Sequence, residues 1–312
     1  MKRFKNISLV GDCDASTLER AAILAKENRA KLTIVLPVKD LPAGSSQLKL
    51  GEKSIDLGKL VLHEYETILA EAAKSVRSLG VRPATKVLVG DPAMEITRDV
   101  IEQQRDLVIM TAEGKGGLKQ RLFGSTSMHL MRKCPVPLLI LKPSRAKRFQ
   151  RILAAIDPDV TGDARDTLNE TILELSLSLS VLEEAELHVV HAWKMLGESL
   201  LRGRIGMYAS EVDRVVRDAG QQRRRAVLAL MAKNSIHKCE LHLIKGEAAE
   251  VIPRLATKLG VDLLVMGTVC RTGIPGFIIG NTADRVLDIV DCSVLVLKPE
   301  GFVSPVAPLI KA

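Results

Sequence analysis

Two stretches of this sequence carry residue types and spacing that suit a phosphate group. The later of the two stretches runs from Gly267 to Thr282 and contains glycines at intervals up to Gly280. It follows the apolar run 263–265 and precedes the amphipathic segment 283–290, so we expect a strand, a glycine-spaced loop and a helix start in that order. Backbone N–H groups and the positive end of a helix dipole both point into such a turn. The sequence therefore predicts a phosphate-binding loop.

An earlier stretch, 110–126, has the same layout, and the chain is predicted to be a tandem duplication. The aspartates that end the first strand of each half, Asp12 and Asp157, lie 145 positions apart (157 − 12). Later landmarks lie 156 positions apart (246 − 90, 262 − 106, 280 − 124 and 299 − 143), so the second half carries 11 more residues (156 − 145), which we place around 194–210. These landmarks are Gly90 and Gly246, Asp106 and Asp262, Gly124 and Gly280, and Pro143 and Pro299.

Length and composition describe a globular protein of two domains. At 312 residues the chain fits two domains of roughly 150 residues. No run of about 18 apolar residues free of charges indicates a membrane span, and the N-terminus has no signal-peptide core, so we expect a cytoplasmic location and no membrane partner. The five cysteines are scattered and odd in number, which argues against a disulfide framework. The net charge of +8 fits either an anionic partner or a solvated basic surface.

Strand and helix patterns alternate through both halves. The strands are near-continuous apolar runs, which predicts parallel sheets covered by helices on both faces. The expected fold class is therefore α/β, with two tandem open parallel five-stranded sheets of Rossmann-like type. We expect domains at 1–144 and 151–300, a basic linker between them, and a loop at 39–51. The predicted strands are 7–10, 31–38, 84–89, 107–110 and 137–141, then 151–156, 186–193, 239–244, 262–266 and 293–297.

In such sheets ligands bind beyond the carboxyl ends of the strands, where the strand order reverses. We therefore expect Asp12 and Asp157 to share that edge with the glycine loops. The alternative for these two aspartates is a helix N-cap or a turn, with Asp14 and Asp159 competing for any cap. The alternative for the glycine loops is an ordinary β–α turn in a half without a ligand.

At Gly246–Pro253 and Gly267–Thr282 the chain resembles the universal stress protein family in its tandem two-domain (E-type) form, across essentially its whole length. Nucleotide-binding members of that family carry Gly-x2-Gly-x9-Gly-Ser/Thr after the fourth strand. The first half reads Thr111-x2-Gly114-x9-Gly124-Ser125, and the second reads Gly267-x2-Cys270-x9-Gly280-Asn281. Each half thus departs from the pattern, at Thr111 in one and at Cys270 and Asn281 in the other.

The resemblance implies an adenine-nucleotide alpha-hydrolase-like fold with the two halves packed as a pseudo-dimer through strands 137–141 and 293–297. It also implies ATP, with magnesium, as the cofactor. Asp12, Val38, Asp157 and Ala192 would contact adenine and ribose. The phosphates would be held by Gly114, Gly124, Ser125, Thr126, Gly267, Gly280, Asn281 and Thr282.

The function that the resemblance implies is a stress-response, nucleotide-binding regulatory protein with no dedicated catalytic residues. Two alternatives stay open: a slow ATPase, and a ligand-free scaffold that acts through protein contacts. A homodimer is a further possible assembly. Nucleic-acid binding is not favoured, because aromatic residues make up only 3% of the chain and consecutive arginines at 223–225 point in different directions on a helix.

Other candidate chemistry is weaker. His237, Cys239 and His242 have a spacing that suggests zinc, but His242 falls on the opposite face of a strand from the other two, so packing is favoured. His188 and His191 also fall on opposite faces of a strand. Cys270 is a candidate reactive thiol, because a position beside a helix N-terminus lowers a thiol pKa.

Overall fold

The computed structural model describes residues 4–11, 13–39, 47–50, 53–112, 123–144, 146, 148–158, 165–203, 208–268 and 280–306. Within them the chain forms two compact units. Unit 1 contains Phe149–Val269 and Gly280–Cys292, and unit 2 contains Arg3–Arg148 together with the chain from Ser293 onward.

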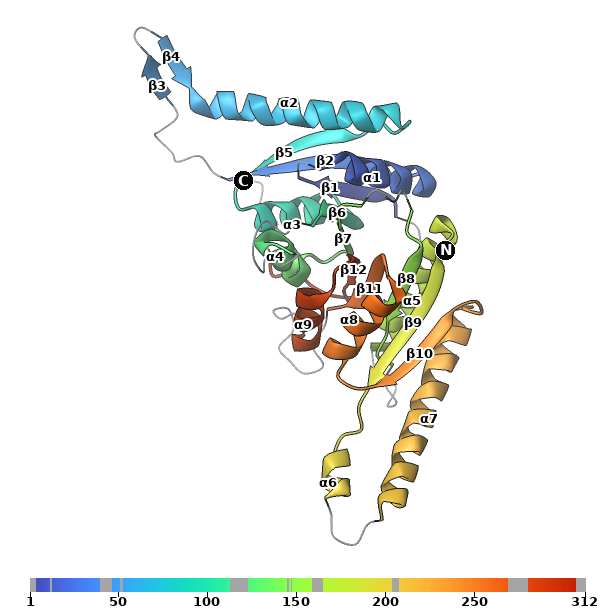
Figure 1. The fold of residues 1–312 in the computed structure, drawn as a ribbon. Helices are drawn as coiled ribbons and strands as arrows, with labels where there is room; N and C mark the ends of the chain where they lie inside the picture. The colour runs from blue at the N-terminus through green and yellow to red at the C-terminus, as the bar shows by residue number, and fades with distance from the viewer. Residues whose placement is uncertain are drawn as a thin grey trace. The chain divides into compact units, whose positions relative to one another are not determined.

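Unit 2 is built around a sheet of order β12-β7-β6-β1-β2-β5, in which all neighbours are parallel except β12 and β7 (Figure 1). Since β1 lies inside the sheet and helices join the strands, the connections are those of a Rossmann-like fold. The strands are β1 (Asn6–Val10), β2 (Lys31–Val38), β5 (Ala84–Val89), β6 (Leu107–Thr111), β7 (Leu138–Leu141) and β12 (Ser293–Leu297), and the helices are α1 (Ala15–Asn28), α2 (Leu57–Ser78), α3 (Pro92–Glu102) and α4 (Ser125–Lys133).

A β-hairpin precedes α2, where the sequence predicted only a loop. Strand β3 (Gln47–Leu50) pairs antiparallel with β4 (Lys53–Asp56). The prediction of a loop over 39–51 was wrong for the last part of that range. Polar and apolar residues alternate in Gln47–Leu50, which suits a strand, but the glycine, proline and serines just before it dominated the prediction.

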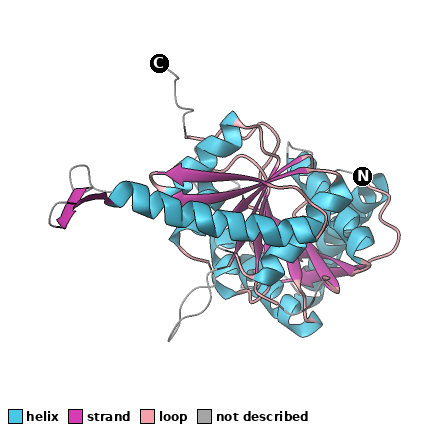
Figure 2. Ribbon diagram, turned by 90° about the horizontal axis from the view of Figure 1, so that it is seen from above, coloured by secondary structure: helices cyan, strands magenta, loops and turns pink. Residues whose placement is uncertain are grey.

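Unit 1 has a parallel sheet of order β10-β9-β8-β11 (Figure 1). Figure 2 shows the strands in magenta and the helices in cyan. A short helix, α6, lies in the 194–210 region, where the sequence placed the extra residues of the second half only as a loop. The strands are β8 (Arg151–Ala155), β9 (Glu186–Trp193), β10 (Glu240–Lys245) and β11 (Leu263–Gly267), and the helices are α5 (Arg165–Glu183), α6 (Glu198–Arg202), α7 (Ala209–Lys233), α8 (Ala248–Leu259) and α9 (Asn281–Ile289).

The central strands are buried on both faces, as their apolar sequences predicted. In β8, Ile152, Leu153 and Ala154 have no exposed surface, and in β1 the same holds for Ile7 and Leu9. Burial of consecutive residues means that helices cover both sides of the sheet. The predicted parallel α/β architecture is thereby confirmed, although β12, the expected fifth strand of the second half, lies in the sheet of unit 2.

The last strand of the chain pairs with a strand of the first half. In the antiparallel ladder of β12 and β7, Leu295 lies opposite Leu139 and Val294 opposite Ile140. This confirms the predicted contact between 293–297 and 137–141. It also explains why β12 belongs to unit 2, although its sequence completes the second repeat.

Each half contains a carboxylate that fixes where its first strand begins. In unit 1, Asp262 Oδ2 accepts hydrogen bonds from the backbone N–H of Gln150 (2.7 Å) and Arg151 (2.9 Å). In unit 2, Asp106 accepts from the backbone N–H of Lys5 (2.6 Å) and Asn6 (2.9 Å). Asp106 directly precedes β6, and Asp262 directly precedes β11. Each aspartate therefore sets the register between that strand and the first strand of its repeat, β1 or β8.

We predict that Asp262→Ala and Asp106→Ala each lower the free energy of unfolding by about 1 kcal/mol, because two N–H groups lose a charged acceptor at a water-accessible edge. Urea unfolding of the full chain measures this. Asp218→Ala, an exposed aspartate of α7, is the matched control and is expected to stay within about 0.5 kcal/mol of wild type. Equal effects at all three positions would contradict the role assigned to the pair.

Candidate functional site

The strand order reverses at one point in each unit. In unit 1, β9 and β10 follow β8 on one side, and β11 lies on its other side, so the switch point lies between β8 and β11. Ala155 pairs with Met266 at the end of this ladder, which places Asp157 and Gly267 just beyond it at the same edge. The prediction that Asp157 lies at the same strand edge as the start of the glycine loop is confirmed for this half.

Asp157 is held by its backbone, and its side chain remains 44% exposed. Asn169 of α5, which is buried, accepts from the Asp157 N–H (3.0 Å) and donates to the Asp157 carbonyl (3.1 Å). His191 lies beneath, with Nδ1 3.2 Å from the Ile156 carbonyl and 3.8 Å from Asp157 Oδ1. Burial lowers the pKa of His191, an effect that the Ile156 carbonyl opposes and the charge of Arg223 reinforces. His191 is therefore neutral at pH 7.

The ends of the second glycine loop meet at the strand edge. The Gly280 N–H donates to the Thr268 carbonyl at 3.0 Å, so the start of α9 is tied to the end of β11. Residues 269–279, including Cys270, lie outside the described residues. The tie brings Gly280, Asn281 and Thr282 to the edge that also holds Asp157 and Gly267.

Helices α9 and α4 begin at glycines that supply no capping side chain. Gly280 (φ −58°) and Gly124 (φ −76°) have ordinary backbone angles, so a left-handed conformation does not explain the choice of glycine. By contrast, α1 and α3 are capped by Asp14 and Asp91. The first N–H groups of α9 and α4 receive no side-chain hydrogen bond from their N-cap residues, which leaves donors for an anion.

In the first half the structure places Gly124, Ser125 and Thr126 at the start of α4. Asp12 and Gly114 lie outside the described residues. Thr111, which replaces the first glycine of the family pattern, ends β6, and its hydroxyl lies 3.2 Å from that of Thr17 on α1.

Gly267 has a packing role that the sequence did not reveal. A Cβ at this position would lie 2.7 Å from Leu168 Cδ2 of α5. Thr111 and Gly267 occupy equivalent positions, 156 apart. The first half has the hydroxyl pair of Thr111 and Thr17 there, and the second half has the Leu168 side chain packed against the glycine backbone. The departure at Thr111 is thus part of how α1 packs.

The ends of β2 and β9 correspond through their hydrogen bonds. Gly90 N–H donates to the Val38 carbonyl (2.8 Å), and Gly246 N–H donates to the Trp193 carbonyl (2.9 Å). Val38 therefore corresponds to Trp193, and Ala192 lies one residue earlier in β9. The guanidinium of Arg223 lies 4.9 Å from the Trp193 ring centroid.

Sequence reasoning missed Asn169, Trp193 and Arg223 as site residues and treated His191 only as packing. Each comes from a helix or strand face whose role depends on tertiary contacts. The one available signal was that Trp193, the single tryptophan of the chain, ends a strand directly before the inserted segment.

Comparison with known proteins agrees with this geometry. The model of the universal stress protein family matches residues 11–142 and again 148–298. The chain belongs to the universal stress protein family. Universal stress protein E of Salmonella typhi is 30% identical over 313 residues, covering 98% of both chains, and its homologue in Haemophilus influenzae is 26% identical over 95% of this chain and 98% of its own.

Two solved structures are similar to this chain over nearly its whole length. A putative universal stress protein from Pseudomonas aeruginosa UCBPP-PA14 has a TM-score of 0.71 at 25% identity, covering 96% of this chain and 95% of that one. A universal stress protein from Archaeoglobus fulgidus shares the fold, with a TM-score of 0.64 at 18% identity over 94% and 98% of the two chains. Membership of this family supports a stress-response role. Among the described residues of this universal stress protein, no helix is long and apolar enough to cross a membrane.

We predict that Gly267→Ala destabilises this universal stress protein by about 1 kcal/mol, because the new Cβ overlaps a terminal methyl group of Leu168, which has to turn aside. Thermal or urea unfolding measures the loss. In a Leu168→Ala background the same substitution is expected to cost markedly less. A cost that is unchanged in that background would show that the glycine is needed for another reason.

His191 makes stability depend on pH. The unfolded chain takes up a proton below about pH 6.5, whereas the folded chain resists it because burial lowers the His191 pKa. The contribution of His191 is therefore fully present above pH 6.5 and declines as the pH falls through the folded-state pKa. Urea unfolding at pH 7.5 and 5.5 is expected to show a larger decline for wild type than for His191→Gln. A parallel decline in both would contradict this.

Proposed function

We propose that this protein binds an adenine nucleotide, ATP with magnesium, at the carboxyl edge of the strands in one or both halves. It acts as a regulatory stress-response protein without a dedicated catalytic set. The observation that carries the proposal is the arrangement in unit 1, where Asp157 and Gly267 flank the switch point and α9 starts there at Gly280 without a capping side chain.

The donors at this edge suit phosphate. Backbone N–H groups at Asn281 and Thr282, with the hydroxyl of Thr282, are placed at the positive end of the α9 dipole. In the first half, Ser125 and Thr126 supply the corresponding groups of α4. We assign the phosphates to these residues and to Gly114, Gly124, Gly267 and Gly280.

The acceptors suit ribose. Asp157 presents a half-exposed carboxylate from a backbone that Asn169 clamps, so it can accept from ribose hydroxyls without moving the strand end. We assign Asp157 and Ala192 to the nucleoside in the second half, and Asp12 and Val38 in the first, although the position that corresponds to Val38 is Trp193. Trp193 ends the same strand as Ala192, with Arg223 stacked on its ring.

Proposed domain boundaries are 1–144 and 151–300, in keeping with the two family matches. We also propose a cytoplasmic location. Sedimentation of the protein with and without nucleotide tests whether it forms a homodimer.

We predict that isothermal titration of the full chain with ATP and magnesium gives saturable binding, and that Asp157→Ala and Gly280→Val each weaken the second site about tenfold. The first removes a charged acceptor, and the second places a branched side chain beside the phosphate donors. Gly203→Val, at an exposed glycine with ordinary φ beyond α6, is the control and is expected to bind as wild type.

A flat titration at millimolar nucleotide would contradict the proposal and favour the scaffold. Phosphate release should be followed in the same samples. Turnover that disappears in the Gly124→Val, Gly280→Val double variant would instead favour the slow ATPase, because those substitutions act only at the two helix starts.

A further inference from the structure

Three side chains on neighbouring strands of unit 1 converge away from the proposed nucleotide site. They are His188 of β9 and Glu240 and His242 of β10. Glu240 lies directly opposite His188 in the parallel ladder, so the two side chains share a face of the sheet. His242, two residues along β10, points to that same face. Glu240 is the first residue of β10, which places the cluster toward the starting edge of the strands, opposite the glycine loops.

The distances between the possible ligand atoms suit a small metal ion. His188 Nδ1 lies 3.2 Å from His242 Nε2 and 3.5 Å from Glu240 Oε2, and His242 Nε2 lies 3.9 Å from Glu240 Oε1. One ligand atom from each residue lies within 4.8 Å of the others. With metal–ligand bonds of about 2.0–2.1 Å in a tetrahedron, ligand atoms lie about 3.3–3.4 Å apart. Two of these distances, from His188 Nδ1 to His242 Nε2 and from His188 Nδ1 to Glu240 Oε2, are already close to that value.

Burial and the surrounding groups also suit a metal. His188 is 6% exposed, and its other ring nitrogen, Nε2, makes no hydrogen bond within the described part of the chain. Glu186 Oε2 lies 3.9 Å from that nitrogen, where a carboxylate can orient a ligating imidazole. Glu186 in turn receives a hydrogen bond from Arg151 of β8 (3.2 Å).

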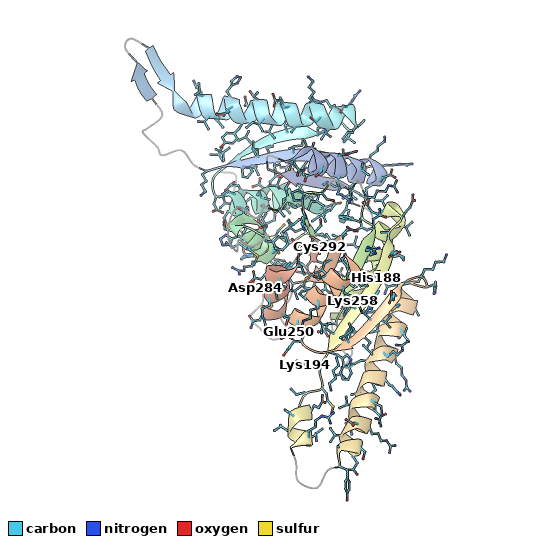
Figure 3. The ribbon with its side chains drawn as sticks, viewed as in Figure 1. His188, Lys194, Glu250, Lys258, Asp284 and Cys292 are labelled. Carbon is cyan, nitrogen blue, oxygen red and sulfur yellow. The ribbon has the colours of Figure 1, made fainter. Side chains whose placement is uncertain are left out.

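The charges around the cluster come from β8, β9, β10 and α8, with Arg151 as the charge of β8. Glu186 and Glu240 contribute two carboxylates from the strands, and Lys258 of α8, a helix that packs on β9, lies close enough for its charge to act on His242 (Figure 3 labels His188 and Lys258).

The cluster differs from the histidine and cysteine set that the sequence suggested. Cys239 directly precedes Glu240 and so falls on the other face of the strand, and His237 is exposed before the strand begins. Only His242 belongs to both sets. Its partner His188 is 54 positions away, and only the β9–β10 register brings the two together.

We propose that His188 Nδ1, His242 Nε2 and one oxygen of Glu240 bind a single Zn²⁺ ion or a similar first-row divalent ion. The fourth position is open to water or an external ligand, as in three-ligand zinc sites. The ion would join β9 to β10, which is the edge strand of the unit 1 sheet next to β9. This site is independent of nucleotide binding.

The test is a zinc titration of the reduced, nucleotide-free full chain against a chromogenic chelator. One ion per chain is expected for wild type, with Glu240→Gln and His242→Gln binding at least about 100-fold more weakly, since loss of an outer partner alone typically costs 10–100-fold. Glu186→Gln is expected to weaken binding about tenfold. His237→Gln is the matched control and should bind as wild type.

Cobalt substitution distinguishes this site from the cysteines. Tetrahedral d–d bands without a thiolate-to-metal charge-transfer band are expected, and they should disappear in Glu240→Gln, whose side chain is 65% exposed and whose loss spares the core. Circular dichroism confirms that each variant is folded. Absence of zinc binding by wild type, a thiolate band, or equal binding by wild type and Glu240→Gln would overturn the proposal.

Discussion

The geometry of each half depends on the register between its first and fourth strands. One carboxylate, Asp106 or Asp262, accepts two backbone N–H groups from the start of the first strand while it leads into the fourth. Because parallel strands advance together, fixing where they begin also fixes where they end. The far ends of β8 and β11 are where Asp157 and Gly267 come together.

The two halves share this backbone frame but differ in the side chains built on it. The hydrogen bond from the Gly90 N–H to the Val38 carbonyl has its counterpart in the bond from the Gly246 N–H to the Trp193 carbonyl. The ends of β2 and β9 are therefore hydrogen-bonded in the same way. At the end of the fourth strand, Thr111 pairs with Thr17 in one half, and Gly267 admits Leu168 in the other. The two halves therefore differ in the side chains at the carboxyl edge of the sheet, while their strand registers are the same.

Opposite ends of one sheet in unit 1 offer different chemistry. The carboxyl edge gathers N–H donors at the start of α9 beside a single carboxylate, a combination suited to a phosphorylated sugar. The starting edge gathers two imidazoles and a carboxylate, which suit a divalent metal. Since successive residues of a strand face opposite sides, β9 can also present His188 to α8 and Trp193 to α7.

The sequence by itself determined the duplication, the alternation of strands and helices, the parallel sheets and the positions of the two glycine-spaced helix starts. These follow from local periodicity and fixed spacing, which neighbouring residues encode. It did not predict the hairpin at Gln47–Asp56, because turn-forming residues beside it hid a short alternating pattern.

Only the tertiary structure decided that Asn169 clamps Asp157, that Gly267 lies against Leu168, and that His188 meets Glu240 and His242. Each of these contacts joins residues far apart in the chain through strand register or helix packing. Their distances depend on how elements are stacked, which no local pattern of residues specifies.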